Sequence, residues 1–359
     1  MRYVFTGGGT GGHIFPALAM AEQATQNDEH AEVLFIGTKS GIESRVVEPQ
    51  GFDLETVNFS GFAGQSVWRK MFVLAKLVSS TREALRHLNK FKPDVVVGVG
   101  GYASLPTSVA AGIKRIPVVL HEQNAVPGLA NKLASFWAAR ICLSMPQGAK
   151  GLAGKSVVMT GNPVRQQMFS CRPWQGDTPQ LLVFGGSQGA SAINKAMVAA
   201  LPQVLERFPT LKVVHQTGRY SLADVVTDYN DRGLNQVEVV EFIDDMSAAY
   251  DQSQLVICRS GATTVAELSA CGRPAILIPL PQAAADHQTC NAQALVDAGA
   301  AYLLPQSDLD GERLAETIID LLDDQQTLKL MAKNAKSLAA KGAAELIIHE
   351  CQILVQKRK

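Results

Sequence analysis

A glycine-rich loop follows a short apolar run twice in this chain, about half a chain apart. Residues 3–5 lead into the glycines of 7–12, and residues 181–184 lead into the loop 185–190. An apolar run followed by such a loop and an amphipathic stretch is typical of a strand, turn and helix that approach a phosphate. The repetition predicts two Rossmann-like units in one chain.

The other short apolar runs support this interpretation, because they are apolar throughout instead of alternating with polar residues. This pattern predicts strands buried on both faces, as in parallel sheets covered by helices. A length of 359 residues also suits two domains. We predict an α/β chain of two doubly wound parallel-sheet domains with a cleft between them. The runs are 3–5, 33–36, 95–99, 118–120, 157–159, 181–184, 213–215, 237–240, 255–258 and 275–278.

The domain boundary is predicted within residues 160–177, which are rich in glycine, proline and polar residues. We therefore expect an N-terminal domain over 1–160 and a C-terminal domain over 161–359. The tail from about residue 314 reads as helical, and its last helix can pack back on the N-terminal domain.

Composition and charge exclude several classes of protein. A hydrophobic content of 47% excludes disorder as the dominant state. The 33 basic and 33 acidic residues give no net charge, which argues against nucleic acid as a partner. The charge is unevenly divided, because residues 1–160 hold 16 basic and 11 acidic residues. That basic half suits an anionic membrane surface.

The six cysteines are scattered, without a C-x-x-C pair or a histidine at ligand spacing. We therefore expect neither a zinc site nor a disulfide framework, and a reducing cytoplasm. The N-terminus does not read as a signal peptide, and no apolar run is long enough to span a membrane. The expectation is a soluble chain, which can still lie on a membrane.

The first glycine loop fits the dinucleotide spacing at Gly7, Gly9 and Gly12. A dinucleotide site also needs an acidic residue at the end of the second strand, and residues 35–39 contain none. That absence weakens the interpretation as an NAD-dependent oxidoreductase. A phosphate near the loop is favoured over a tight turn that needs glycine for packing alone.

Polar residues follow several predicted strands at the edge where open parallel sheets bind ligands. Ser187 can donate to a phosphate or cap the following helix. Glu267 can bind a ribose hydroxyl, or it can be an acidic residue that is stabilised by the dipole at a helix N-terminus. Residues 121–124 and 286–291 are predicted to line the same site, which we favour over core packing.

Seven motifs in this order resemble those of glycosyltransferase family 28, and specifically its members that act in peptidoglycan synthesis. The resemblance covers roughly residues 1–340. One departure is Leu105, where the family usually has glycine before proline. The motifs are GGTGGH at 8–13, GGY at 100–102, HEQN at 121–124, GNPVR at 161–165, GGSQGA at 185–190, EFIDDM at 241–246 and RSGAxTxxE at 259–267.

The resemblance implies the GT-B fold and inverting transfer of N-acetylglucosamine from UDP-N-acetylglucosamine to the 4-hydroxyl of the N-acetylmuramoyl sugar of lipid I. The product would be lipid II for peptidoglycan synthesis, with links to cell shape and division. It also implies a peripheral protein on the cytoplasmic face of the bacterial inner membrane, with other cell-wall synthesis proteins as possible partners. Alternatives are a glycolipid synthase or epimerase of the same fold, or a non-catalytic nucleotide-sugar-binding subunit.

By position in the motifs, the resemblance implies that uracil contacts Ile243, the ribose Glu267 and the diphosphate Ser187 with Arg165. The sugar would contact Asn124, Gln288 and the helix start after residue 261. Residues 10–13 with 100–102 would face the acceptor pyrophosphate. The full set of implied substrate contacts is Thr10, Gly11, Gly12, Asn124, Arg165, Ser187, Ile243, Ala262, Thr263, Thr264, Val265, Ala266, Glu267 and Gln288.

His13 is the preferred general base, because it lies in a glycine loop predicted to face the cleft and titrates near neutral pH. A structural histidine is the alternative, and Glu122 is a second candidate for the base. We predict no cofactor and no metal requirement, because a helix N-terminus and Arg165 can stabilise departing UDP.

Residues 66–92 are a candidate membrane contact. Positions 67, 71, 74, 78, 81, 85 and 88 form one apolar stripe that is expected to face the core. Apolar residues off that stripe alternate with cations, as in an interfacial helix, and a helix buried on two sides is the alternative. The predicted contacts are Trp68, Arg69, Phe72, Val73 and Lys76.

Overall fold

The computed structural model describes residues 1–359 apart from 40, 60–66, 153–155, 176–177 and 359, and gives the backbone alone for 67–74. The chain forms two compact units. The first comprises Met1–Arg165 with Gly342–Lys359, and the second comprises Gln166–Lys341. The last helix therefore belongs with the first unit.

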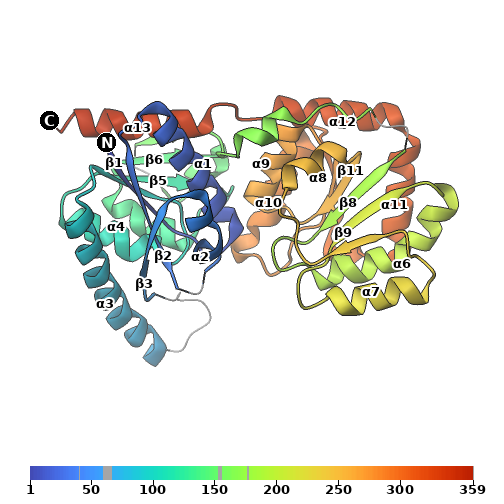
Figure 1. The fold of residues 1–359 in the computed structure, drawn as a ribbon, viewed down its shortest axis with the longest axis horizontal. Helices are drawn as coiled ribbons and strands as arrows, with labels where there is room; N and C mark the ends of the chain where they lie inside the picture. Colours follow the sequence, from blue (N-terminus) through green and yellow to red (C-terminus); the bar gives the residue numbers. More distant parts are fainter. Residues whose placement is uncertain (40, 60–66, 153–155, 176–177, 359) are drawn as a thin grey trace. The chain divides into compact units, whose positions relative to one another are not determined.

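The first unit is built on a seven-stranded sheet whose strands are all parallel (Figure 1). The strand order is β3-β2-β1-β4-β5-β6-β7. The strands are β1 (Arg2–Thr6), β2 (Glu32–Thr38), β3 (Asp53–Val57), β4 (Val95–Gly98), β5 (Val118–Glu122), β6 (Arg140–Leu143) and β7 (Val157–Met159).

Helices cover both faces of this sheet because its strands are apolar on both sides. On β1, Tyr3 and Phe5 pack toward α1 and α13, whereas Val4 packs in the opposite core with α3, α4 and α5. The helices are α1 (Gly11–Asn27), α2 (Glu43–Val46), α3 (Val67–Phe91), α4 (Ser104–Ile113), α5 (Leu129–Ala134) and α13 (Ala343–Gln356).

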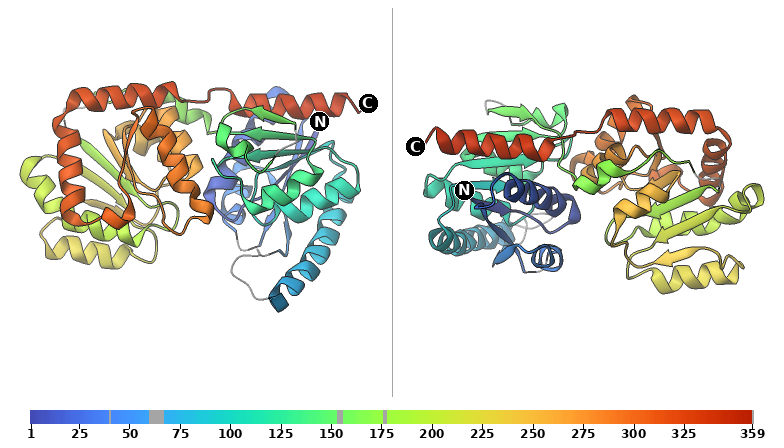
Figure 2. Two further views of the ribbon diagram at one scale, coloured as in Figure 1. Left: turned by 180° about the vertical axis from the view of Figure 1, so that it is seen from behind. Right: turned by 45° about the horizontal axis from the view of Figure 1, so that its top comes forward.

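The second unit repeats the plan with a six-stranded parallel sheet in the order β10-β9-β8-β11-β12-β13. Figure 2 shows this sheet between its helices from two further directions. The strands are β8 (Gln180–Phe184), β9 (Lys212–Gln216), β10 (Glu238–Val240), β11 (Leu255–Cys258), β12 (Ala275–Leu277) and β13 (Ala301–Leu303).

Seven α-helices are described in the second unit. The main core packs β8 and β11 against α6 and α11. The helices are α6 (Ser191–Arg207), α7 (Leu222–Asp231), α8 (Met246–Gln252), α9 (Ala262–Cys271), α10 (His287–Asp297), α11 (Gly311–Asp323) and α12 (Gln325–Ser337).

These two parallel sheets confirm the predicted α/β class, but three strands were missed. Edge strand β3 carries polar residues and lacks a continuous apolar run, and the short strands β6 and β13 were also not predicted. The predicted stripe on α3 is wrong at Val78, which is 51% exposed. The same stripe is buried at Leu88, and the helix also buries Ala84, in the core shared with α4.

The strand orders put both glycine loops at a topological switch point. In the first sheet the order reverses at β1, between β2 and β4, and in the second it reverses at β8, between β9 and β11. Ligands bind outside the carboxyl ends of strands at such points. Among the helices of the described residues, none is long and apolar enough to cross a membrane.

Candidate active site

The two glycine loops of the first unit lie against each other, backbone to backbone. Gly7 and Gly8 follow β1, and Gly100 and Gly101 follow β4 across the switch point. The amide of Gly8 donates to the carbonyl of Gly100 at 3.3 Å. A Cβ at Gly101 would lie 2.2 Å from the oxygen of Gly8, and its φ of +79° also favours glycine. Glycine is thus required here for close approach.

A buried carboxylate holds the first loop. Glu43 is fully buried, and it accepts hydrogen bonds from the amides of Gly9 at 2.9 Å and Thr38 at 2.7 Å. The Thr38 hydroxyl donates to the same carboxylate at 2.9 Å. Glu43 was not among the predicted site residues, and its position five residues after β2 gives no local signal of this role. The sequence has no acidic residue at the end of β2, but Glu43 of α2 places a carboxylate there, and this carboxylate binds the loop backbone.

His13 lies on the first turn of α1, beside the loop that contains Gly100 and Gly101. Its Nδ1 is 3.1 Å from the hydroxyl of Thr10, the N-cap residue of α1. A Cβ at Gly100 would lie 3.0 Å from His13 Cδ2, so the imidazole lies over that glycine. The structure therefore brings together residues 10–13 and 100–101 at one edge of the sheet.

Three of the four residues in the segment 121–124 are buried in the core. His121 Nε2 lies 3.1 Å from the Ser144 hydroxyl, and the Gln123 amide donates to His121 Nδ1 at 3.1 Å. Burial, with a smaller effect of the nearby His13, lowers the pKa of His121 to about 4. The preference for a site over core packing is wrong for His121 and Gln123, because both side chains are buried in the core.

Glu122 has a similar structural position. Its carboxylate accepts hydrogen bonds from the amides of Asn124 and Gly128, both at 3.0 Å, and from Asn131 Nδ2 at 2.9 Å. These bonds hold the loop between β5 and α5. The remaining member of the segment, Asn124, is half-buried.

Arg165 ends the first unit, and its guanidinium lies 5.0 Å from the centroid of the Phe15 ring on α1. Burial raises the pKa of Glu22 on the same helix, and Arg165 opposes that effect. Arg165 thus packs against α1.

In the second unit, a cavity of about 330 Å³ lies at the switch point between β8 and β11. It joins the second glycine loop to the start of α6 and to the loops after β11, β12 and β13. Of the predicted contacts it includes Gln288. Its lining residues are Gly185, Gly189, Ala190, Ser191, Ala192, Arg259, Leu280, Gln282, Gln288 and Gln306.

Arg259 supplies positive charge to this cavity. Its Nη1 donates to the carbonyls of Ile278 at 3.0 Å and Pro279 at 2.9 Å, and its Nη2 donates to Gln306 at 2.6 Å. Burial lowers the pKa of the guanidinium, which stays protonated at neutral pH. Arg259 begins the motif at 259–267 but was not among the predicted substrate contacts.

Ser187 lies exposed in the second glycine loop, four residues before α6 begins. The N-cap of α6 is Ala190, without a side-chain hydrogen bond. The alternative that Ser187 caps this helix is therefore wrong. Its hydroxyl lies in the loop beside the cavity, as a phosphate contact would require.

Gln288 is tethered at both its backbone and its side chain. Its carbonyl accepts from the Ser260 hydroxyl at 2.8 Å, and its Oε1 accepts from the amide of Leu280 at 2.9 Å. The side-chain nitrogen is consequently the group that Gln288 can present to a hydroxyl.

The helix start predicted to meet the sugar is the N-terminus of α9. Ala262, Thr263 and Val265 are buried there, whereas Thr264 and Ala266 are half-buried. Glu267 follows, 7% exposed, and its carboxylate accepts a hydrogen bond from the hydroxyl of buried Tyr250 at 3.3 Å. Half-buried Ile243 lies in the loop before α8.

Two predicted features have a limited structural description. Trp68, Arg69, Phe72 and Val73 lie outside the residues whose side chains are described, and Lys76 is half-buried on α3. Within the described ranges, no three or more His, Cys, Asp or Glu residues form a group that could hold a metal ion.

Solved structures with the same arrangement define the class. The crystal structure of Acinetobacter baumannii MurG matches with a TM-score of 0.77 at 35% identity, covering 99% of both chains. A UDP-GlcNAc 2-epimerase from Neisseria meningitidis matches with a TM-score of 0.68 at 16% identity, which shows the fold alone. The chain has the GT-B fold of nucleotide-sugar enzymes.

The sequence comparisons narrow this class. Residues 3–143 match the glycosyltransferase family 28 N-terminal domain, and residues 180–347 match the glycosyltransferase family 28 C-terminal domain. The chain therefore belongs to glycosyltransferase family 28, which confirms the resemblance found in the motifs.

Two relatives carry one and the same name, UDP-N-acetylglucosamine--N-acetylmuramyl-(pentapeptide) pyrophosphoryl-undecaprenol N-acetylglucosamine transferase. The protein from Syntrophotalea carbinolica is 50% identical over 352 residues, covering 98% of each chain. The protein from Syntrophus aciditrophicus is 43% identical over 359 residues, covering 99% of each chain.

Proposed function

We propose that this hexosyltransferase moves N-acetylglucosamine from UDP-N-acetylglucosamine to the 4-hydroxyl of the N-acetylmuramoyl sugar of lipid I, giving lipid II for peptidoglycan synthesis. The observation that carries the proposal is 50% identity, over 98% of both chains, to a transferase named for this reaction. An epimerase or glycolipid synthase is less favoured, because the epimerase similarity is confined to the fold.

The donor binds in the second unit. The contrast in charge between the two switch points supports this assignment. In the first, the amide of Gly9 already donates to the carboxylate of Glu43, so this amide is not available to the donor diphosphate. In the second, the cavity beside the glycine loop contains the guanidinium of Arg259. A diphosphate is attracted to the second loop, with Ser187 as a hydroxyl donor.

We assign the contacts of the ribose, the uracil and the sugar to residues at the same edge of the second sheet. Glu267 binds ribose hydroxyls, and the backbone near Ile243 binds uracil. Gln288 and the N-terminus of α9 bind the sugar, whose orientation sets the reacting carbon. The acceptor pyrophosphate lies on the first unit, at residues 10–13 after the amide that Glu43 occupies.

Transfer proceeds by one displacement with inversion. His13 accepts the proton of the acceptor 4-hydroxyl as its oxygen bonds to C1 of N-acetylglucosamine, and the bond from C1 to the UDP oxygen breaks. Arg259 and the loop before α6 stabilise the negative charge that develops on UDP. No metal ion is needed for this step, so turnover should persist in excess chelator.

The protein acts as a peripheral protein at the cytoplasmic face of the inner membrane. Ile113, Phe136 and Trp137 are exposed on the first unit, and the Trp137 ring packs where a Cβ of Gly112 would lie. Lys114 and Arg115 follow directly and are also exposed. We name Ile113, Lys114, Arg115, Phe136 and Trp137 the aromatic-basic patch. Apolar rings beside cations bind anionic bilayer surfaces.

Ligand binding tests the donor assignment directly. Thermal unfolding with UDP, UDP-N-acetylglucosamine or NAD should show stabilisation by the two uridine nucleotides, since a ligand at 100 times its Kd contributes about 2.7 kcal/mol. Stabilisation by NAD alone would contradict the assignment. Nuclear magnetic resonance of the product should show a β-linkage from the α-linked donor, whereas an α-linkage would exclude inversion.

A further inference from the structure

Glu267 carries a carboxylate into a nearly closed environment. It lies on α9, is 7% exposed, and follows the buried residues Ala262 and Thr263. A buried carboxylate needs hydrogen-bond donors to offset its lost hydration. The Tyr250 hydroxyl is such a donor, at 3.3 Å from Glu267 Oε2.

Tyr250 can act only as a donor in this pair. It is fully buried, and burial together with the negative charge of Glu267 raises the pKa of its phenol well above the usual value. The phenol therefore keeps its proton at any pH at which the enzyme works. Fixing one carboxylate oxygen fixes the plane of the group and hence the direction of the other.

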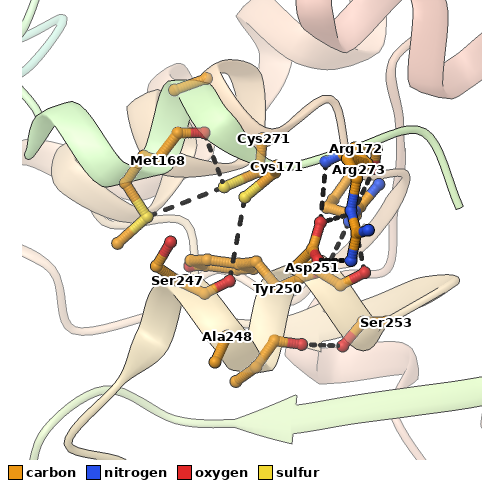
Figure 3. Close-up of polar contacts among 12 residues, drawn as sticks. Met168, Cys171, Arg172, Ser247, Ala248, Tyr250, Asp251, Ser253, Cys271 and Arg273 are labelled. Carbon is orange, nitrogen blue, oxygen red and sulfur yellow. Dashed lines mark hydrogen bonds and ion pairs between the residues drawn. The ribbon is translucent and has the colours of Figure 1, made fainter.

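The tyrosine is itself held in place. Its ring meets Phe184 of β8 edge to face, with centroids 6.1 Å apart. Its backbone carbonyl accepts from Arg273 Nε at 2.5 Å, and Arg273 Nη2 donates to the carbonyls of Asp251 at 3.0 Å and Arg172 at 2.7 Å. Figure 3 shows the Arg273 guanidinium beside the backbone that follows Tyr250. The phenol is consequently fixed at both its ring and its backbone.

We propose that Tyr250 is a positioning residue that orients Glu267 toward the ribose hydroxyls of the uridine nucleotide. The inference rests on the proposed donor site, and it adds a residue that touches no substrate. Tyr250→Phe should weaken the binding of UDP roughly tenfold, because hydrogen bonds to charged groups are the stronger ones. It should raise KM for UDP-N-acetylglucosamine by a similar factor and change kcat less than twofold.

The chain provides a matched control in Tyr229. It is also buried in the second unit, at 1% exposure, and its hydroxyl pairs with His215 Nδ1 at 2.9 Å. Tyr229→Phe removes the same atom from the same unit, away from Glu267. Its UDP affinity should match that of the parent protein. Equal weakening in both variants would overturn the proposal, because it would indicate general loosening.

A combined comparison of two ligands and two variants distinguishes failure of the proposed donor site from failure of the positioning role of Tyr250. Isothermal titration would compare UDP with 2′-deoxy-UDP on the parent protein, Glu267→Gln and Tyr250→Phe. The parent protein should bind 2′-deoxy-UDP more weakly than UDP. In both variants the difference in affinity between the two ligands should be smaller than in the parent. If Glu267→Gln binds UDP as well as the parent, the donor site itself is wrong. If Glu267→Gln weakens binding while Tyr250→Phe does not, only the positioning role is wrong.

A second substitution protects the test against misfolding. Replacing Tyr250 by 4-aminophenylalanine keeps a hydrogen-bond donor at the same position and should restore UDP binding to within about threefold of the parent. Failure of this variant to bind UDP better than Tyr250→Phe, with both folded by circular dichroism, would overturn the proposal.

Discussion

The amide of Gly9 donates to the carboxylate of Glu43 at 2.9 Å, so the first glycine loop of this chain contains its own fixed anion. The corresponding edge of the second sheet has the guanidinium of Arg259 in its cavity. Two loops of similar sequence thus differ in the charge around them. This difference favours the nucleotide diphosphate in the second unit.

Glu43→Gln should destabilise the protein by about 1–3 kcal/mol, because the new amide group must face a backbone donor at Gly9 or Thr38. Turnover should fall as well, since the loop that supports His13 loses an anchor. Urea unfolding and initial rates measure both effects. The same change at exposed Glu48, five residues further on, is the control and should leave both unchanged.

His13→Ala should lower kcat by about 10²–10⁴-fold, the usual contribution of a general base. UDP affinity should stay within about twofold, because the donor site lies in the other unit. Steady-state kinetics and UDP titration provide the two readings, with exposed His30→Ala as the control. Turnover within a few-fold of the parent would remove His13 from the role of base.

Arg259→Met should reduce UDP affinity roughly tenfold or more, since a charge-assisted contact to phosphate is lost and two carbonyls lose their donor. Uridine, which lacks phosphate, should lose less affinity than UDP. Arg232→Met on the exposed surface of the same unit is the control. Equal losses for uridine and UDP would show that Arg259 acts through the fold and not on the diphosphate.

Stability should fall below neutral pH because two histidines are buried uncharged. Burial lowers the pKa of His121 and of His215 to about 4, from 6.5. Above pH 6.5 neither state takes up the proton, so the stabilisation is complete. As the pH falls toward 4 the unfolded chain binds protons that the folded chain refuses, and each histidine contributes a loss of about 3 kcal/mol.

Urea unfolding between pH 7 and pH 5 measures this slope. His121→Gln should flatten it, whatever the absolute stability of the variant. An unchanged slope would mean that His121 is charged in the folded protein.

Phe136→Ser combined with Trp137→Ser should reduce binding to anionic vesicles, because both rings are exposed in the aromatic-basic patch, at 73% and 41%. Turnover of a soluble, short-chain acceptor should be preserved. Tyr220→Ser removes an aromatic ring that is 87% exposed on the second unit, and should leave vesicle binding intact. Vesicle sedimentation measures the binding. If the double variant bound vesicles as well as the parent protein, the aromatic-basic patch would not be the membrane contact.

The sheets and the position of the site could be predicted because apolar strands and glycine loops are local patterns. Both glycine loops follow the strands at which the order reverses, so their sequence already located the ligand edge. Edge strand β3 could not be found in this way, since its sequence DLETV lacks the continuous apolar run of a central strand.

The side-chain roles were harder to predict, because burial depends on the tertiary structure. His121 and Glu122 read as site residues at a strand end, yet both are buried and bonded to protein groups. Glu43 and Tyr250 carried no local signal of their function. Glu43 acts through its contact with Gly9, which is distant in sequence. Tyr250 acts through its contact with Glu267, which lies on another helix.

Transfer of labelled N-acetylglucosamine from UDP-N-acetylglucosamine to a lipid I analogue tests the central claim most directly. The account predicts one labelled disaccharide product for each UDP released, with little product from Glu267→Gln or His13→Ala. Release of UDP with N-acetylmannosamine in place of a labelled lipid product, or no reaction at all, would contradict it.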